Sequence, residues 1–242
     1  MATDSGTEAG GVVSPDTRRI ASVLQTIPLF QVLGEEGVLA TVQAGPTRRY
    51  APGQIICYQG DPGDRLYVVV EGLVKVVLTS ERGDEIVLRT QGSAEVFGEL
   101  ALLDGAPRSA SVVAVEPTYV FMLLRTQLLA LMRRHPGLAD EFLRMLGQLV
   151  RRLTEQAGDL VFLDLAGRLA KLLLQLAEKY GREQDGVLDR RLTQSDLAAM
   201  IGASRPAVNR ALQALAARGL IALQDHAIVI RDVAGLRKRV GL

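Results

Sequence analysis

The sequence predicts an α+β protein in which a roll of short strands is followed by a long helix and a small helical domain. Short β-type runs separated by Gly- and Asp-rich turns fill residues 50–124. After Thr126 the apolar residues recur three and four positions apart, which is the period of a helix. Further on, two helical segments that meet at Gly202 precede a short hairpin-like run. These three observations define the fold class.

Composition places the chain among globular proteins of one or two domains, with 242 residues, 48% of them apolar and 23% charged. The single cysteine, Cys57, excludes an internal disulfide framework and any zinc or iron–sulfur site built on clustered cysteines. A lone cysteine also fits a reducing compartment. No cleavable leader is recognised, and no apolar run reaches the about 18 residues that a membrane span needs. We therefore expect a cytoplasmic protein without a membrane partner.

The first part of the chain is expected to form a disordered tail and then a jelly-roll-like β-roll over residues 20–137. Residues 1–19 are the predicted tail, since the chain opens on small, polar and acidic residues. Helical spacing in RRIASVLQTIPLF and EEGVLATVQA predicts two short helices. The strands are expected at residues 54–59, 65–72, 73–80, 85–91, 109–116 and 118–124. Cys57 lies in the first of these strands and is expected to be a small core residue.

A long amphipathic helix is expected over residues 138–160, inside a segment with a hinge that we delimit as residues 138–164. Its apolar stripe consists of Phe142, Leu146, Leu149, Leu153, Ala157 and Leu160. Such a stripe packs either on its own domain or on a second copy of the chain. The last domain, residues 165–242, carries a net charge of +6, whereas residues 1–164 carry −5. This asymmetry favours a polyanionic partner for the last domain.

The last domain has the pattern of a winged helix-turn-helix. Thr193 and Asp196 resemble a capping box at the start of a short helix, which Gly202 ends. Ser204 caps a second helix with Pro206 in its first turn, where a missing N–H is harmless. A hairpin follows, as the wing does in DNA-binding domains of this kind. The expected small core consists of Leu197, Ile201, Val208, Leu212 and Leu215.

The second of these helices carries residues suited to reading double-stranded DNA. Arg205, Asn209 and Arg210 lie near its start, where a recognition helix meets base edges in the major groove. Arginine matches guanine, and asparagine can match adenine. Ser204 and Thr193 suit phosphate oxygens. A plain helical hairpin with solvated arginines is the alternative, but cap, Gly turn, arginine and wing occur here in the right order.

One more segment, FGELALLDGAPRSASVVA at residues 97–114, is mostly small and apolar yet holds Glu99 and Arg108. It resembles the phosphate-binding cassette of cyclic-nucleotide domains. LTQSDLAAMIGASRPAVNRALQALAARGLI is similar to the helix-turn-helix of the CRP/FNR family of bacterial transcription regulators. RRLTEQAGDLVFLDLAGRLAKLLLQLA between them resembles that family's dimerisation helix and hinge. The chain is thus identified as a member of this family over about residues 20–235.

The resemblance implies a homodimer that binds cAMP, or cGMP, as an allosteric ligand and needs no metal. Gly98, Glu99 and Leu100 would begin a short helix facing the cyclic phosphate. Arg108 would pair with that phosphate and Ser109 would bond to it. Glu99 would accept a hydrogen bond from the ribose 2′-hydroxyl, and Ala101 would leave room. The alternative is a buried Glu99–Arg108 ion pair with a structural role.

The chain departs from the family at two places. The cAMP-responsive members read the base with a Thr–Ser pair, which falls here on Leu153 and Thr154. Thr154 can still contact a purine, so cAMP is favoured, while cGMP or another nucleotide stays open. The best-known members have Glu where this chain has Pro206. We therefore expect an altered preference at one position of a TGTGA-type half-site.

Other classes of function are less well supported by the sequence. No Walker loop, HExxH, GxSxG or metal-spaced His/Cys motif is found, so we expect no enzyme activity. His135 and His226 are expected to be surface or capping residues rather than haem ligands. Three classes remain: a ligand-responsive transcription factor, a constitutive one with a non-functional pocket, and a nucleotide-binding module that controls a protein partner. For the first, the resemblance implies operator DNA, a second copy and RNA polymerase as partners.

Overall fold

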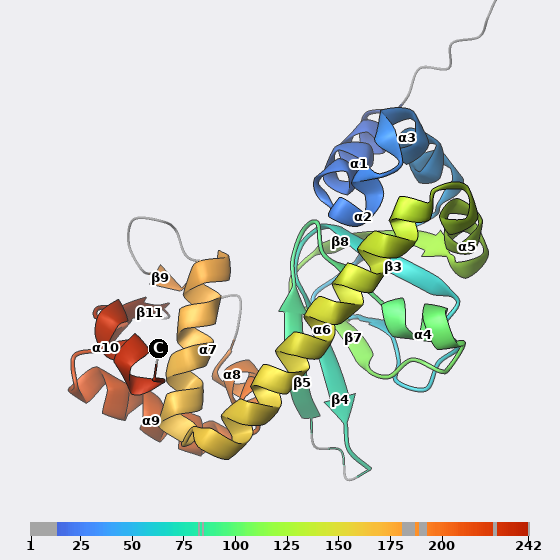
Figure 1. Ribbon diagram of the computed structural model, residues 1–242. Helices are drawn as coiled ribbons and strands as arrows, with labels where there is room; N and C mark the ends of the chain where they lie inside the picture. The colour runs from blue at the N-terminus through green and yellow to red at the C-terminus, as the bar shows by residue number, and fades with distance from the viewer. Residues whose placement is uncertain are drawn as a thin grey trace, which may run out of the picture.

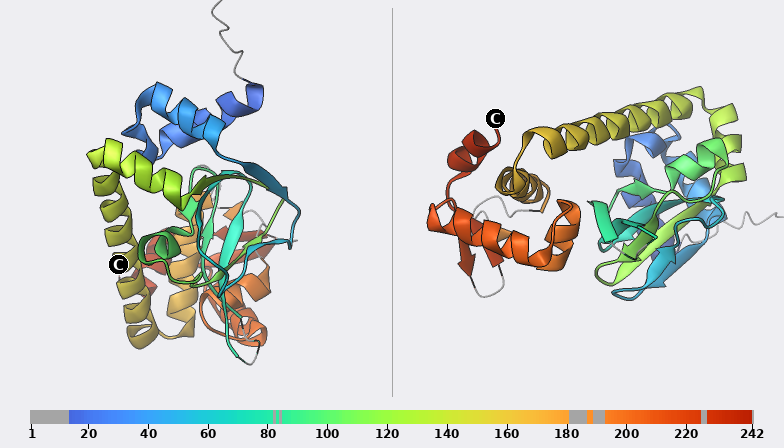
Figure 2. Two further views of the ribbon diagram at one scale, coloured as in Figure 1. Left: turned by 90° about the vertical axis from the view of Figure 1, so that its right-hand side faces the viewer. Right: turned by 90° about the horizontal axis from the view of Figure 1, so that it is seen from below.

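A computed structural model describes residues 14–81, 83, 85–180, 187–188, 193–224 and 227–241. The chain forms two lobes joined by the long helix α6, Pro136–Phe162 (Figures 1 and 2). We call the part from α1 to α5 the first lobe and the part from α7 to α10 the second lobe. His226 and residues 1–13 lie outside the described residues.

The first lobe opens with three helices, α1 Pro15–Thr26, α2 Pro28–Gln31 and α3 Gly34–Ala44. The side chain of Ser14 accepts a hydrogen bond from the backbone N–H of Thr17, and Pro15 occupies the first helical position. Cap, proline and the acidic Asp16 together start the helix. The tail was predicted to extend to residue 19 and the helical spacing to begin at Arg18, but the helix begins earlier, at Pro15.

The strands of the first lobe form two four-stranded antiparallel sheets, which confirms the β-roll. The orders are β1-β8-β3-β6 and β2-β7-β4-β5. Each predicted run contains a strand; β1 and β6 were not predicted. The bounds are β1 Thr47–Tyr50, β2 Ile55–Cys57, β3 Arg65–Glu71, β4 Val74–Thr79, β5 Glu85–Gln91, β6 Val96–Phe97, β7 Ser111–Ala114 and β8 Thr118–Leu124. The short helix α4, Glu99–Asp104, separates β6 from β7.

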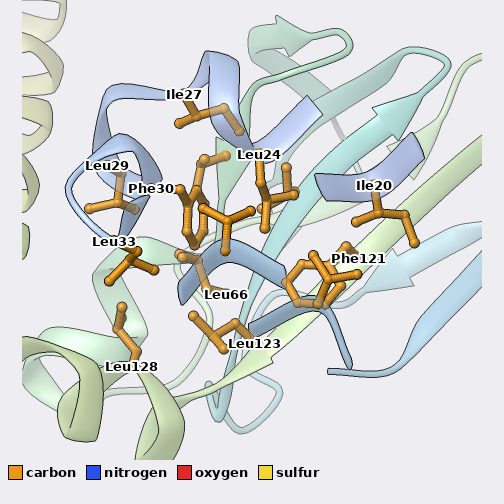
Figure 3. Close-up of a cluster of buried hydrophobic side chains, with 14 of the residues drawn as sticks. Ile20, Leu24, Ile27, Leu29, Phe30, Leu33, Leu66, Phe121, Leu123 and Leu128 are labelled. Carbon is orange, nitrogen blue, oxygen red and sulfur yellow. The ribbon is translucent and has the colours of Figure 1, made fainter. Parts of the chain in front are cut away.

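The core of the first lobe lies on both faces of β3 and β8. On one face, Leu24 and Phe30 from the helices pack toward Leu66 and Phe121 (Figure 3). On the other face, Val69 and Val120 join a second cluster between the two sheets. Because both faces are covered, β3 and β8 carry continuous apolar runs, Leu66–Val70 and Tyr119–Leu124, rather than an alternation.

Helix α5, Arg125–Arg134, leads into α6, whose predicted apolar stripe is divided between two environments. Phe142 is buried in the core of the first lobe, and Leu146 packs against that core. Of the two alternatives for the stripe, packing on its own domain therefore holds for these two residues. The exposed large apolar side chains of the helix are Leu143, Val150, Leu153, Leu160, Val161 and Phe162, of which Leu153 and Leu160 belong to the predicted stripe.

The second lobe is a helix-turn-helix with a wing, as predicted. Its elements are α7 Leu165–Tyr180, β9 Val187–Leu188, α8 Gln194–Met200, α9 Arg205–Ala217, β10 Ile221–Gln224, β11 Ala227–Ile230 and α10 Val233–Arg239. All of the predicted core residues, Leu197, Ile201, Val208, Leu212 and Leu215, are buried. Helix α10 was not predicted. Within the described ranges, no helix is long and apolar enough to cross a membrane.

The hinge between the lobes is held by Asp164, which lies between α6 and α7. One carboxylate oxygen accepts a hydrogen bond from the N–H of Gly167 at 2.8 Å and so caps α7. The other oxygen is paired with Arg239 of α10. The Gly167 N–H and the Arg239 guanidinium lower the pKa of this carboxyl. The C-terminal helix is thereby tied to the hinge.

A charged pair joins the two lobes where α8 packs against β5. Lys75 Nζ of β4 lies 2.7 Å from Asp196 Oδ1. The other oxygen of Asp196 accepts hydrogen bonds from the N–H and the hydroxyl of Thr193, which completes the predicted capping box. Burial alone would raise the pKa of Asp196, but the hydrogen bonds from Lys75 and Thr193 outweigh it and lower the pKa.

We expect acidification to weaken this contact. A carboxyl whose folded-state pKa is depressed contributes stability above its unfolded-state pKa, near 4, and loses that contribution as the pH falls through the folded value. At pH 7, Lys75→Met should lower the free energy of unfolding by about 1–3 kcal/mol, and with it the midpoint of thermal unfolding by several degrees. The difference from the wild type should shrink progressively once the pH falls below about 4 and through the depressed folded-state pKa, as the carboxyl becomes protonated. A difference independent of pH would contradict this origin.

Candidate functional site

The cassette segment forms a compact turn around α4. Gly98, just before the helix, has a left-handed backbone with φ of 82°, and Gly105 ends the helix with φ of 71°. Arg125 Nε donates a hydrogen bond to the carbonyl of Leu102 at 2.7 Å, which fastens the C-terminal end of α4 to α5. The N-terminal end of α4 is fastened by Arg108.

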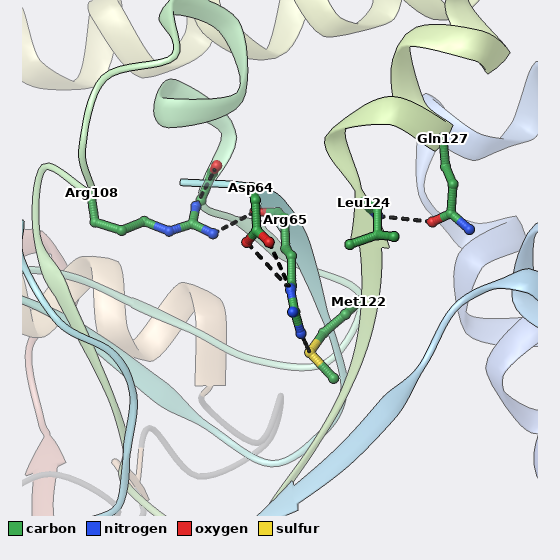
Figure 4. A network of polar contacts seen from close by, with 7 residues as sticks. Asp64, Arg65, Arg108, Met122, Leu124 and Gln127 are labelled. Atoms are coloured by element: carbon green, nitrogen blue, oxygen red, sulfur yellow. Dashed lines mark hydrogen bonds and ion pairs between the residues drawn. The ribbon is translucent and has the colours of Figure 1, made fainter. Parts of the chain in front are cut away.

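Arg108 is a buried guanidinium held by backbone carbonyls, with 5% of the residue exposed. Its Nη1 donates to the carbonyl of Gly98 at 2.9 Å and its Nη2 to the carbonyl of Arg65 at 2.7 Å (Figure 4). The guanidinium carbon lies 5.2 Å from the centre of the Tyr67 ring, which stacks on Phe97. Arg108 Nε has no hydrogen-bond partner among the described residues. The charge is thus fixed in place by Nη1 and Nη2 while the N–H of Nε remains without a partner.

Glu99, at the first position of α4, is buried with 4% of the residue exposed. Its Oε1 lies 2.9 Å from Nη2 of Arg89, a residue of β5. Its Oε2 has no hydrogen-bond partner within the part of the chain that the structure describes. The ion pair between Glu99 and Arg108 that the sequence offered as an alternative is therefore not the one formed. Arg89 was not predicted, although a charged residue inside the strand EIVLRTQ was a signal that could have identified it.

The other predicted cassette residues lie around this pair. Leu100 is 39% exposed on α4, and Ser109 is exposed after Arg108. Ala101 is buried, and a Cβ added at Gly63 would come within 2.0 Å of the Ala101 Cβ. The absence of a side chain at Gly63 therefore leaves room for Ala101.

The predicted base-reading residues lie on α6. Thr154 is exposed, and its hydroxyl donates to the carbonyl of Val150 at 3.0 Å. Leu153 is 46% exposed. The side chain of Gln156, one half-turn further along, donates to the carbonyl of Leu88 in β5 at 3.2 Å. The stretch of α6 around Thr154 thus lies beside the strand that carries Arg89.

Gly98→Ala should damage the cassette through a specific clash. A Cβ there would come within 2.4 Å of Arg108 Nη1, at a backbone conformation that disfavours a side chain. We expect the unfolding free energy to drop by about 1–3 kcal/mol and Arg108 to lose its position. Gly105→Ala is the matched control, because Gly105 also has a positive φ but a Cβ there meets nothing within 4 Å. Chemical denaturation of both variants measures the difference, and equal destabilisation would contradict the clash.

The remaining candidate residues from the sequence are Cys57 and His135. Cys57 is buried in the core between the sheets, and burial raises the pKa of its thiol, which disfavours the reactive thiolate. His135 is the residue between α5 and α6. Over the described ranges, no group of three or more His, Cys, Asp or Glu side chains is placed to hold a metal ion.

The second lobe presents the predicted recognition residues to solvent. Ser204 caps α9 by accepting a hydrogen bond from the N–H of Ala207. The side chains of Arg205, Pro206, Asn209 and Arg210 are all exposed. Thr193 is exposed as well, although its hydroxyl is engaged with Asp196 in the capping box. One helix thus offers two arginines and an asparagine from its first two turns.

Comparison with known proteins finds a matching family model for each of the two lobes. The family model for the cyclic nucleotide-binding domain matches residues 47–135, and that for the Crp-like helix-turn-helix domain matches residues 167–239. The chain is 35% identical over 219 residues to the CRP-like cAMP-activated global transcriptional regulator of Mycobacterium tuberculosis, covering 90% of this chain and 98% of that protein. The chain belongs to the CRP/FNR family.

Two further similarities agree with this assignment. The cyclic AMP receptor protein of Thermus thermophilus is 37% identical over 211 residues, which are 87% of this chain and 95% of that protein. The solved structure of the c-di-GMP responsive global regulator CLP of Xanthomonas campestris is similar with a TM-score of 0.63 and 27% identity, over 77% of this chain and 93% of that one. Like the CRP/FNR family, the chain is a DNA-binding transcription regulator with a cyclic nucleotide-binding domain, and it is not an enzyme.

Proposed function

We propose that the chain is a cAMP-responsive regulator whose ligand binds in the first lobe against Arg108 and Glu99. The observation that carries this proposal is the pair of unused polar atoms, Arg108 Nε and Glu99 Oε2, on two buried and otherwise fixed side chains. Buried polar groups are normally satisfied, so a cassette that leaves one donor and one acceptor unused suits a ligand offering both. Two similar proteins are named for their response to cAMP, which supports this choice of nucleotide.

The cyclic phosphate and the ribose are assigned to different cassette residues. Arg108, with Ser109 beside it, takes the anionic phosphate, because a planar guanidinium matches that group. Gly98 lets the backbone approach, and Glu99 accepts a hydrogen bond from the 2′-hydroxyl. Thr154 faces the purine from α6, where its hydroxyl would exchange the bond to Val150 for one to the base.

The active form that we propose is a homodimer joined along α6. Leu143, Val150 and Ala157 recur every seven residues, and Leu153 and Leu160 follow the last two by three, which is the spacing of a two-stranded coiled coil. Two-fold symmetry then calls for a pseudo-palindromic operator with half-sites about 34 Å apart. Nucleotide binding between the β-roll and α6 would shift the lobes about the hinge at residues 162–164. RNA polymerase is the expected further partner, and the cytoplasm, where bacterial DNA lies, is the expected location.

The recognition helix would read each half-site through Arg205 and Arg210, with Asn209 as an additional base contact. Pro206 cannot accept a hydrogen bond from a base, so one position of the half-site is expected to be read less strictly. Ser204 and Thr193 would contact phosphates. Because phosphate contacts dominate such interfaces, the affinity should fall steeply as salt is raised.

The proposal is tested by fluorescence anisotropy of a labelled TGTGA-type palindrome, titrated with protein alone, with cAMP, with cGMP and with c-di-GMP. Tighter binding with cAMP than with the others is the expected result. Preference for another nucleotide would identify that nucleotide as the ligand in place of cAMP. The titration with c-di-GMP is included because a similar regulator responds to it. Equal binding in all titrations would indicate a constitutive regulator and contradict the proposal.

A further inference from the structure

We propose that Arg89 is a positioning residue that presents Glu99 to the ribose of the nucleotide; this inference rests on the proposed function. No role was assigned to Arg89 by sequence reasoning. It lies on β5, ten residues before Glu99, and its guanidinium meets the Glu99 carboxylate at 2.9 Å. The side chains of Arg89 and Glu99 are 22% and 5% exposed. The pair is therefore largely withdrawn from water.

The need for Arg89 follows from the burial of Glu99. An ionised carboxylate with so little contact with water stays ionised only when a cation or several donors compensate for its lost hydration. Arg108 is close in sequence but is not that cation, because its two terminal nitrogens are bonded to the carbonyls of Gly98 and Arg65. Arg89 is the cation with which Glu99 forms an ion pair among the described residues.

The geometry of the pair leaves one oxygen for a ligand. Arg89 reaches Oε1, and Oε2 has no partner among the described residues. A buried guanidinium that holds one oxygen restricts the rotation of the carboxylate, so the region that the free oxygen occupies is limited before a ligand arrives. A carboxylate bonded through both oxygens would offer an incoming hydroxyl fewer free lone pairs.

Arg89 is itself held between the cassette and α6. The residue before it, Leu88, accepts a hydrogen bond from the side chain of Gln156 at 3.2 Å. Its strand is also paired with β4 along its length. The guanidinium therefore comes from a fixed backbone, which is what a residue that positions another one needs.

The test compares cAMP with 2′-deoxy-cAMP by calorimetric titration of the full chain. In the wild type, the hydroxyl contact with Glu99 should make cAMP roughly ten- to hundredfold tighter, as expected for a hydrogen bond to a charged group. Arg89→Met should bring the two affinities to within about threefold of each other, because nothing then holds the Glu99 carboxylate in position for the hydroxyl. Arg89→Lys keeps the charge without the planar fork and should recover part of the ratio.

Two controls separate positioning from general damage. Arg19→Met removes an exposed Arg–Glu pair of the same lobe, Arg19 with Glu71, and should leave the ratio unchanged. Adding Arg89→Met to Glu99→Gln should not change the ratio further, because both act through one oxygen. If the wild type prefers cAMP to 2′-deoxy-cAMP and Arg89→Met shows the same preference, the role of Arg89 is contradicted. The proposed function is not affected by that result. A wild type that binds neither nucleotide would overturn the proposed function, and this inference with it.

Discussion

Arg108→Ala is expected to lower the affinity for cAMP by at least about a hundredfold, because it removes a charge and a fork of donors from the phosphate site. DNA binding by the variant should then be the same with and without nucleotide. The residue is buried and holds two backbone carbonyls in place, so its loss affects the ligand and the cassette together. Calorimetry with cAMP measures the first effect, and anisotropy with the operator duplex measures the second.

Arg65→Ala is a suitable control for this experiment. The Arg65 side chain points away from Arg108, toward Asp64 and Met122 (Figure 4). Only its backbone carbonyl accepts the hydrogen bond from Arg108, and that carbonyl is kept in the variant. We expect Arg65→Ala to bind cAMP like the wild type. Arg108→Lys should keep the fold and the charge but lose the fork of donors, so a loss of binding in that variant cannot be ascribed to unfolding. Binding of cAMP by Arg108→Ala within a few-fold of the wild type would contradict the assigned role.

Much of the fold followed from local patterns. The capping box at Thr193, the cap at Ser204 and the strand runs of the β-roll depend on residues a few positions apart, and such signals can be read from a sequence. Strand β6 has only two residues, and β1 contains two arginines, so neither carries an apolar alternation. Both become strands because neighbouring strands supply their hydrogen bonds, which no local pattern reveals.

The candidate site was predicted in its residues but not in its pairings. Glu99 and Arg108 stood out as charges in an apolar segment, and the structure buries both. Their partners come from other strands: Arg89 is on β5, and the carbonyl of Arg65 is on β3. Which cation meets which carboxylate depends on how the sheets fold over α4, and spacing alone cannot decide that. The same limit applied to Phe142. Its spacing showed that it lies on the apolar face of α6, but only the folded structure shows that it packs into the core of the first lobe.

Val150→Asp is expected to dissociate the proposed dimer and to lower operator affinity by about 10²- to 10⁴-fold, the usual gain from linking two binding modules. Val150 is 60% exposed on α6, so the change leaves the core of each protomer intact. In a parallel dimer, Val150 of one protomer would face Val150 of the other across the seam. Two carboxylates would then face each other in place of two apolar side chains, which costs burial and adds repulsion. Sedimentation velocity would measure the oligomeric state, and anisotropy would measure operator binding.

Gln148→Asp is the matched control, because it adds the same charge at an exposed position of α6 outside the heptad seam. It should sediment as a dimer and bind the operator as the wild type does. Since each cassette is built mainly within its own lobe, Val150→Asp should still bind cAMP, with a loss limited to whatever the partner adds near Thr154. A Val150→Asp variant that remains dimeric would show that the seven-residue pattern on α6 is not the interface. The exposed apolar side chains of that helix would then need another partner.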